Sequence, residues 1–218
     1  MTEPVADVPE RWPVVEREVV HETTRVVSVR REVVQPPAAR DRFVRDVVVH
    51  PGAVGIVALD ERERVLVVHQ YRHPVGHRLV EVPAGLLDVA GEAYDTAARR
   101  ELFEEAHVRA ERWSVLVDLF TSPGMTDESV RIFLARDLTD VPDADRHVGE
   151  HEEADMPVSR VPLAELVRGV LGGELHNPVL VAGVLAAWAV RAGEGYDALR
   201  PADAPWPARD ALPTRRSR

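Results

Sequence analysis

One feature of the sequence constrains the fold more than any other: short runs rich in β-branched residues are interrupted by a single helical segment in the first half of the chain. We predict strands over residues 25–34, 43–49, 54–59, 65–71, 79–82, 113–120 and 130–135. One helix is predicted over 96–106, and two more over 163–171 and 178–191. Asn177 and Pro178 are suited to the N-cap and first turn of the last helix. This order predicts an α+β fold, a mixed sheet flanked by helices in a sandwich.

Composition narrows the class of partner. The 27 basic residues against 37 acidic ones give a formal charge of −10, which argues against a nucleic-acid surface. The chain has no Cys, which rules out disulfides and zinc-thiolate sites. The N-terminus lacks the basic and apolar regions of a secretory signal, and the longest apolar stretch, 178–190, is too short to span a membrane. We therefore expect a cytoplasmic protein that binds neither nucleic acid nor membrane.

Three carboxylates are concentrated on the early helix. Ala98, Leu102 and Ala106 recur every four residues and form an apolar stripe. Glu101 and Glu105 lie one turn apart on an adjacent face, with Glu104 beside them. Because like charges at this spacing destabilise a helix, we expect a cation or an Arg to neutralise the cluster, and Mg²⁺ prefers such oxygen ligands. A run of this kind taken alone is more often a solvated charged face.

The longer segment resembles the Nudix box, G-x5-E-x7-R-E-U-x-E-E-x-G-U, with U a bulky aliphatic residue. Its fixed positions are filled by Gly85, Glu92, Arg100, Glu101, Leu102, Glu104, Glu105 and Val108. Two differences stand out: six residues separate Gly85 from Glu92, and His107 replaces the second glycine. The longer loop costs little closure entropy, whereas a His is less suited than Gly to the left-handed turn at a helix end.

The resemblance implies a Nudix α/β/α sandwich and roles for its matching residues. Glu101 and Glu105 would be the main Mg²⁺ ligands, with Mn²⁺ as a possible substitute and Glu104 as a further or orienting ligand. Glu92 and Arg100 would brace the loop through a salt bridge. In the subgroup that cleaves ADP-ribose, the backbone carbonyl before the box glycine, here that of Ala84, also binds metal.

Residues outside the box indicate the substrate. Pro123 lies sixteen residues after His107, and its setting resembles the Ser-Pro-Gly-x-Thr/Ser-x-Glu loop of the ADP-ribose subgroup. A Pro-Gly pair alone is an ordinary turn signal. Arg72 would contact the phosphates, because a guanidinium binds them in a bidentate way, although it could also be an exposed strand-end residue. The expected substrate-binding set is Arg45, Arg72, Glu81, Gly85, Leu86, Pro123, Gly124, Met125 and Glu128.

A second acidic segment, 149–156, reads as a loop. In the ADP-ribose subgroup a mobile loop here delivers a carboxylate to the attacking water. Its Glu-x-Glu pattern matches Glu150 and Glu152. We expect Glu150 as the general base and an added metal ligand, with Glu152 second and Glu153 third, and Glu105 as a further catalytic residue. Solvated loop charges are the alternative reading.

These features predict Mg²⁺-dependent hydrolysis of ADP-ribose to AMP and ribose 5-phosphate by an ADP-ribose pyrophosphatase. Another nucleoside diphosphate derivative, such as an NDP-sugar or dinucleoside polyphosphate, is the alternative substrate, and a module that binds ADP-ribose without hydrolysis is the alternative class. We also expect a small N-terminal β-rich segment, residues 1–50, and a homodimer that pairs through it and the apolar helix at 178–190. Residues 51–198 would form the Nudix domain, and 199–218 a disordered tail.

Overall fold

The computed structural model describes residues 5–22, 27–142 and 156–212. The chain divides into two compact units. The first comprises Met1–Pro51, Ser122–Glu128 and Pro205–Arg218. The second comprises Gly52–Thr121 and Ser129–Ala204, and it contains the carboxylate helix. No helix in the described part of the chain is long and apolar enough to cross a membrane.

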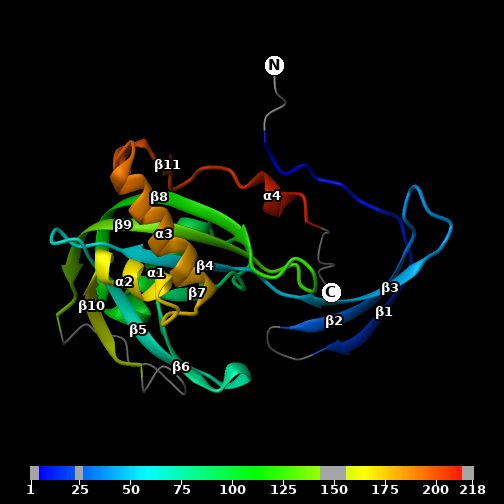
Figure 1. Cartoon of the computed structure of the whole chain (residues 1–218), viewed down its shortest axis with the longest axis horizontal. Helices are drawn as coiled ribbons and strands as arrows, with labels where there is room; N and C mark the ends of the chain where they lie inside the picture. The colour runs from blue at the N-terminus through cyan, green and yellow to red at the C-terminus, as the bar shows by residue number, and fades with distance from the viewer. Residues whose placement is uncertain (1–4, 23–26, 143–155, 213–218) are drawn as a thin grey trace. The chain divides into compact units, whose positions relative to one another are not determined.

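Two sheets build the second unit (Figure 1). The larger has the order β11-β8-β9-β4-β7, formed by β4 (Ala53–Ala58), β7 (Ala84–Leu86), β8 (Val108–Phe120), β9 (Ser129–Asp140) and β11 (Arg200–Pro201). It is mixed, because β4 and β9 run parallel while the other pairs are antiparallel. The smaller sheet has the order β10-β5-β6, formed by β5 (Arg64–Arg72), β6 (His77–Glu81) and β10 (Val158–Pro162). The short 3-10 helix η1 (His73–Val75) joins β5 to β6.

Helices cover both faces of the larger sheet. These are α1 (Tyr94–Ala106), α2 (Leu163–Leu171) and α3 (Pro178–Ala192), followed by the 3-10 helix η4 (Tyr196–Ala198). Side chains alternate along β4, so Ile56 joins the buried cluster that contains Leu102 of α1. Val57, its neighbour, joins the cluster that contains Leu163 of α2 and Leu180 of α3. This arrangement confirms the predicted α+β sandwich with a mixed sheet.

Several element boundaries match their predictions closely. Helix α2 has the predicted bounds, and α1 begins two residues earlier than predicted, at Tyr94. The Asn177 side chain caps α3 by accepting hydrogen bonds from the N–H groups of Val179 and Leu180, both at 2.9 Å. The local capping chemistry therefore sets the start of α3 as its sequence indicated.

Helix α3 uses its apolar surface inside the second unit. Leu180, Val184 and Ala187 are fully buried, and the helix packs on β4, β8 and β9. Gly183 permits close approach, because a Cβ there would lie 2.8 Å from Val57 Cγ2 and 3.3 Å from Ile132 Cγ2. The expectation that this helix offers apolar surface to a partner is thus wrong for these buried residues.

The segment expected to be a disordered tail is ordered over residues 199–212. Strand β11 pairs with β8, and the carbonyl of Ala204 accepts a hydrogen bond from Arg131 at 2.6 Å. Further on, Trp206 is 3% exposed and precedes the short helix α4 (Pro207–Asp210). Aromatic burial and backbone pairing outweigh the Pro-rich composition on which the expectation rested.

An antiparallel sheet of three strands dominates the first unit: β1 (Val14–Glu22), β2 (Ser28–Val34) and β3 (Phe43–Val49), in that order. The loop 122–128 joins this sheet, since Val48 N–H donates to the Met125 carbonyl at 2.8 Å and Asp127 N–H donates to the Val48 carbonyl at 3.2 Å. The Asp127 carboxylate also accepts from His50 N–H at 2.8 Å. The N-terminal strands and the Pro-Gly loop therefore form one structural group.

Candidate active site

Helix α1 presents its carboxylates away from the core. Its buried residues, Ala97, Ala98, Leu102 and Ala106, attach one face to the larger sheet. The side chains of Glu101 and Glu104 lie outside that buried stripe and are 12% and 32% exposed. The apolar face thus fixes the helix, and the acidic face meets the backbone of β7.

Glu101 and Gly85 are in very close contact. A Cβ built on Gly85 would fall far inside 3.0 Å of the Glu101 carboxyl group, a separation that real Cβ atoms essentially never show. Gly85 is paired with Val54 in the sheet, so its backbone cannot easily retreat. Glycine is needed here for space, because any side chain would displace the Glu101 carboxylate.

Glu105 is held by the preceding residue of β7. The backbone N–H of Ala84 donates to Glu105 Oε2 at 3.0 Å. A backbone donor of this kind orients the carboxylate. Two consecutive residues of one strand therefore fix two carboxylates that lie one turn apart on α1.

Arg100 balances the charge of the cluster. Its guanidinium donates to both oxygens of Glu92 at 3.1 Å, to Glu101 Oε1 at 2.6 Å and to Glu104 Oε2 at 3.2 Å. The hydrogen bonds to Glu92 raise the pKa of Arg100, and the charge of Glu101 adds to this effect against partial burial. This network ties the loop before α1 to the helix.

Sequence reasoning paired Arg100 with Glu92 alone. The contact with Glu104 was detectable, because i,i+4 spacing places two side chains together on a helix. The contact with Glu101, the next residue along the chain, has no such signal, because neighbours in sequence do not face each other on a helix.

The donor set fits a hard divalent cation. Within residues 5–22, 27–142 and 156–212, no three His, Asp or Glu side chains are gathered into a metal-binding group. Arg100 engages Glu101 and Glu104, and Ala84 engages Glu105. Nevertheless Glu101 lies against Gly85 and Glu105 accepts a hydrogen bond from the Ala84 N–H, so both carboxylates are held at neighbouring residues of β7. Anionic oxygens of this kind are the ligands that Mg²⁺ and Mn²⁺ prefer.

His107 ends the helix in the left-handed conformation, with φ 53° and ψ 40°. Its N–H donates to the carbonyls of Leu102 and Phe103, and its own carbonyl accepts from Val141 N–H at 2.8 Å. Its Nδ1 is buried without a hydrogen-bond partner among the described residues. A His therefore adopts the turn that the Nudix pattern gives to Gly, with some strain.

Arg72 and Glu81 form a bidentate ion pair at the ends of β5 and β6. Arg72 Nε donates to Glu81 Oε1 at 2.8 Å and Nη2 donates to Oε2 at 2.7 Å. Glu81 is 2% exposed, so the pair anchors the arginine on a buried carboxylate. Arg72 is thereby held in a defined orientation, and its role toward phosphates stays a prediction.

The remaining expected substrate residues divide between the two units. Leu86 ends β7 in the second unit, beside Gly85. The first unit contains the other five. Pro123, Gly124, Met125 and Glu128 lie in its loop 122–128, and Arg45 lies on β3. Arg45 stacks over Phe43 at 4.4 Å, and Glu128 lies 3.4 Å from His50 Nδ1. Glu150, Glu152 and Glu153 fall outside the described residues.

Comparison with known proteins agrees with this geometry. Residues 49–175 match the model of the NUDIX domain. An ADP-ribose pyrophosphatase of Mycobacterium tuberculosis (strain ATCC 25618 / H37Rv) is 48% identical over 184 residues, which cover 84% of this chain and 86% of that protein. An ADP-ribose pyrophosphatase of Bacillus subtilis (strain 168) is 35% identical over 133 residues, covering 61% and 70%.

The fold also matches a solved structure. The crystal structure of an ADP compounds hydrolase aligns with a TM-score of 0.72 and 21% identity, over 87% of this chain and 99% of that one. At this identity the likeness concerns the fold alone. With the domain match and the relative that is 48% identical, it leads to one conclusion: this chain belongs to the Nudix family.

Proposed function

We propose that this chain hydrolyses the pyrophosphate of ADP-ribose to AMP and ribose 5-phosphate. One observation carries the proposal: Glu101 contacts Gly85 and Glu105 accepts a hydrogen bond from Ala84, so two carboxylates of α1 are held by consecutive residues of β7. The names of the two relatives support the choice of substrate. One water adds across one P–O–P bridge: a new P–O bond forms at one phosphorus while its bond to the bridging oxygen breaks.

The proposed metal ligands are the carboxylates of Glu101, Glu104, Glu105 and Glu150 and the carbonyl of Ala84. Magnesium is the proposed ion, with manganese as a substitute. When bound, such an ion neutralises phosphate charge and lowers the pKa of a coordinated water. Ala84 N–H orients Glu105, and the close contact with Gly85 orients Glu101. Arg100 and Glu92 hold the loop against the helix so that these carboxylates keep their positions.

A glutamate of the segment 149–156 is proposed to take the proton of the attacking water. Glu150 is the first choice, Glu152 the second and Glu153 the third, with Glu105 as an additional catalytic group.

The residues expected from the sequence to bind substrate are proposed for that role. Arg72, oriented by Glu81, would bind phosphate oxygens in the bidentate manner of a guanidinium. Gly85 and Leu86 would approach the substrate through the backbone of β7. Arg45 and the loop residues Pro123, Gly124, Met125 and Glu128, which belong to the first unit, are proposed as further substrate-binding residues.

A substrate panel tests the proposal. The purified protein is incubated with Mg²⁺ and equal concentrations of ADP-ribose, an ADP-sugar, a GDP-sugar and a dinucleoside polyphosphate, and kcat/KM is measured for each. ADP-ribose should give the highest value. A higher kcat/KM for another compound would show that the substrate is another nucleoside diphosphate derivative. Binding of ADP-ribose without turnover of any compound would indicate a binding module.

We also propose a cytoplasmic homodimer that pairs through the N-terminal strands. Every residue of β1 is exposed, including Val15 at 41% and Val19 at 59%. Val44 on β3 adds a further apolar side chain that is 52% exposed. A sheet with this much apolar exposure is suited to burial against a second copy. Light scattering at micromolar concentration should give twice the chain mass of 24.2 kDa, and a stable monomer would contradict the dimer.

A further inference from the structure

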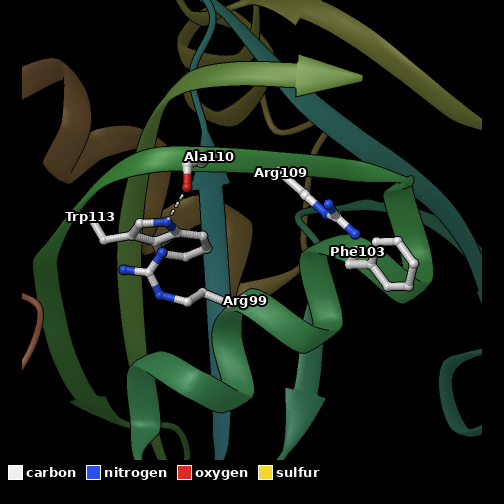
Figure 2. Close-up of a pocket in the computed structure, with 5 residues that line it drawn as sticks. All are labelled: Arg99, Phe103, Arg109, Ala110 and Trp113. Atoms are coloured by element: carbon white, nitrogen blue, oxygen red, sulfur yellow. Dashed lines mark hydrogen bonds between the residues drawn. The ribbon is translucent and has the colours of Figure 1, made fainter. Parts of the chain in front are cut away.

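A pocket of about 200 Å³ lies between α1 and β8, lined by Arg99, Phe103, Arg109, Ala110 and Trp113. Figure 2 shows the five residues, with Arg99 and Phe103 on the helix and Arg109, Ala110 and Trp113 on the strand. Arg99 lies two positions from Glu101 on α1, which is about 200° around the helix. The pocket is therefore on another face of α1 from the carboxylates of the candidate active site.

Two arginines in this pocket each lie over an aromatic ring. The Cζ atom of Arg99 lies 4.8 Å from the ring centroid of Trp113, and that of Arg109 lies 5.3 Å from the centroid of Phe103 (Figure 2). The attraction between a guanidinium and a ring comes from the positive charge and the ring's quadrupole, so N–H groups can still donate hydrogen bonds to another group. The rings thus hold two cationic groups in place without consuming their donors.

Nearby carboxylates neutralise these arginines only in part. Asp95 approaches Arg99 Nε at 3.7 Å, which is an ion-pair distance and longer than a hydrogen bond. Among the residues that the structure describes, no carboxylate pairs with Arg109. By contrast Arg112, on the same strand, forms a bidentate pair with Asp137. The chain as a whole has a formal charge of −10. Because Arg99 and Arg109 have so little acidic pairing, this pocket carries a local positive charge.

The indole of Trp113 forms a fixed wall of the pocket. Its Nε1–H donates to the Ala110 carbonyl at 2.9 Å, and the side chain is largely buried, with 9% of the residue exposed. The ring that carries Arg99 is consequently rigid. A pocket with a fixed apolar wall and two guanidinium groups is suited to a small anion of two charges.

We propose that this pocket binds a phosphate group, either as inorganic phosphate or as part of a small phosphate monoester. The dianion matches the two guanidinium groups in charge, and its oxygens accept several N–H bonds at once. The rings of Phe103 and Trp113 would contact the carbon atoms of an ester. The proposal concerns binding outside the candidate active site and does not depend on the proposed hydrolysis.

The indole N–H signal of Trp113 in a ¹H–¹⁵N NMR spectrum provides a local measurement. The full chain is titrated with sodium phosphate, and separately with ribose 5-phosphate, at constant ionic strength and without divalent metal. The signal is assigned from its loss in Trp113→Phe. Saturable shifts with dissociation constants on the order of millimolar are expected, as is reasonable for ligands of so few atoms. Tighter binding of the ester would identify the monoester as the ligand, and binding of inorganic phosphate as tight as or tighter than the ester would show that the pocket recognises the phosphate group alone.

Matched variants separate the pocket from general charge effects. Arg109→Gln and Arg99→Gln should each weaken binding about tenfold, as expected for loss of a charged hydrogen bond. Arg168→Gln, which removes an exposed arginine of α2, should leave binding unchanged. The proposal is overturned if Trp113 shows no saturable shift with either probe, if the pocket variants bind like the wild type, or if Arg168→Gln weakens binding equally.

Discussion

The carboxylate of Glu101 lies against the backbone of Gly85 with no room for a side chain between them. Since Gly85 is fixed in the sheet by its pairing with Val54, the carboxylate must move if a methyl group is added. Gly85→Ala should therefore lower kcat/KM by about 100-fold or more, the cost of misplacing a reacting or ligand group by about 1 Å. Gly91→Ala is the control: its φ of +78° is strained for Ala, but nothing lies within 4 Å of the added Cβ. A Gly85→Ala enzyme that is no slower than Gly91→Ala would contradict this reading of the contact.

Removing the charge of either seated carboxylate should abolish activity and leave the fold intact. Glu101→Gln and Glu105→Gln each replace an anionic oxygen ligand, while the Gln carbonyl can still accept the Ala84 N–H at position 105. Relief of like-charge repulsion on α1 should keep the unfolding free energy without metal within about 0.5 kcal/mol of the wild type, or slightly above it. Glu165→Gln, on the exposed face of α2, serves as the matched control and should keep full activity. Near-normal turnover of the position 101 and 105 variants at moderate Mg²⁺ would place the metal site elsewhere.

His107 offers a test of backbone strain at the end of α1. Its left-handed φ of 53° costs a residue with a Cβ about 1–2 kcal/mol, and most for a β-branched one. His107→Gly should keep or raise the unfolding free energy, by up to about 1 kcal/mol, because it relieves the strain and removes a buried unpaired Nδ1. His107→Val should lower it by about 1–2 kcal/mol. Urea denaturation of both variants measures the free-energy cost of the left-handed backbone at position 107. A Val variant as stable as the Gly variant would show that this cost is absent.

The segment 149–156 carries a prediction about turnover. If Glu150 takes the proton of the attacking water, Glu150→Gln should lower kcat by about 10²–10⁴-fold and leave the affinity for substrate nearly unchanged. Glu152→Gln and Glu153→Gln should be assayed beside it at saturating substrate. Loss of activity in Glu152→Gln alone would move the role by two residues. If all three variants stay active, the base lies outside this segment.

Asp60 links stability to pH in the turn before β5. Although burial opposes it, hydrogen bonds from the backbone and guanidinium of Arg64 and from Arg62 N–H lower the pKa of Asp60 below its ordinary value of 3.8. A carboxyl group with a lowered pKa stabilises the fold above its unfolded pKa and loses that contribution as the pH falls through the folded pKa. Asp60→Asn should thus be less stable than the wild type at pH 7, and the gap should shrink below about pH 3.8. Thermal melts over this range check the trend, and a gap that widens in acid would be inconsistent with it.

Local signals in the sequence predicted the helices better than the sheet edges. Asn177, Pro178 and the apolar stripe of α1 act through neighbours a few residues away, so their effects are readable from spacing. Strand β1 was missed because its valines come in two pairs separated by three charged residues, which breaks the period of two, and because it is stabilised by pairing with β2. Strand β10 was missed because it is a short edge strand that ends in Pro162 and pairs with β5, far away in sequence.

The candidate site shows the same division. The spacing of Glu101 and Glu105 on α1 followed from helix geometry. Their contacts with Ala84 and Gly85 depend on the position of β7, which is set by its pairing with β4. The spacing of residues along the sequence does not predict that pairing. The ion pair of Arg72 with Glu81 likewise depends on the register between β5 and β6.

Product analysis by ³¹P NMR tests the central claim most directly. The purified chain is incubated with ADP-ribose and Mg²⁺, and in parallel with a chelator or as Glu105→Gln. We predict that the pyrophosphate signals disappear while two phosphate monoester signals, those of AMP and ribose 5-phosphate, grow in equal amounts, and only in the wild-type sample with metal. Unchanged pyrophosphate signals in that sample, or equal hydrolysis with the chelator present, would contradict the account.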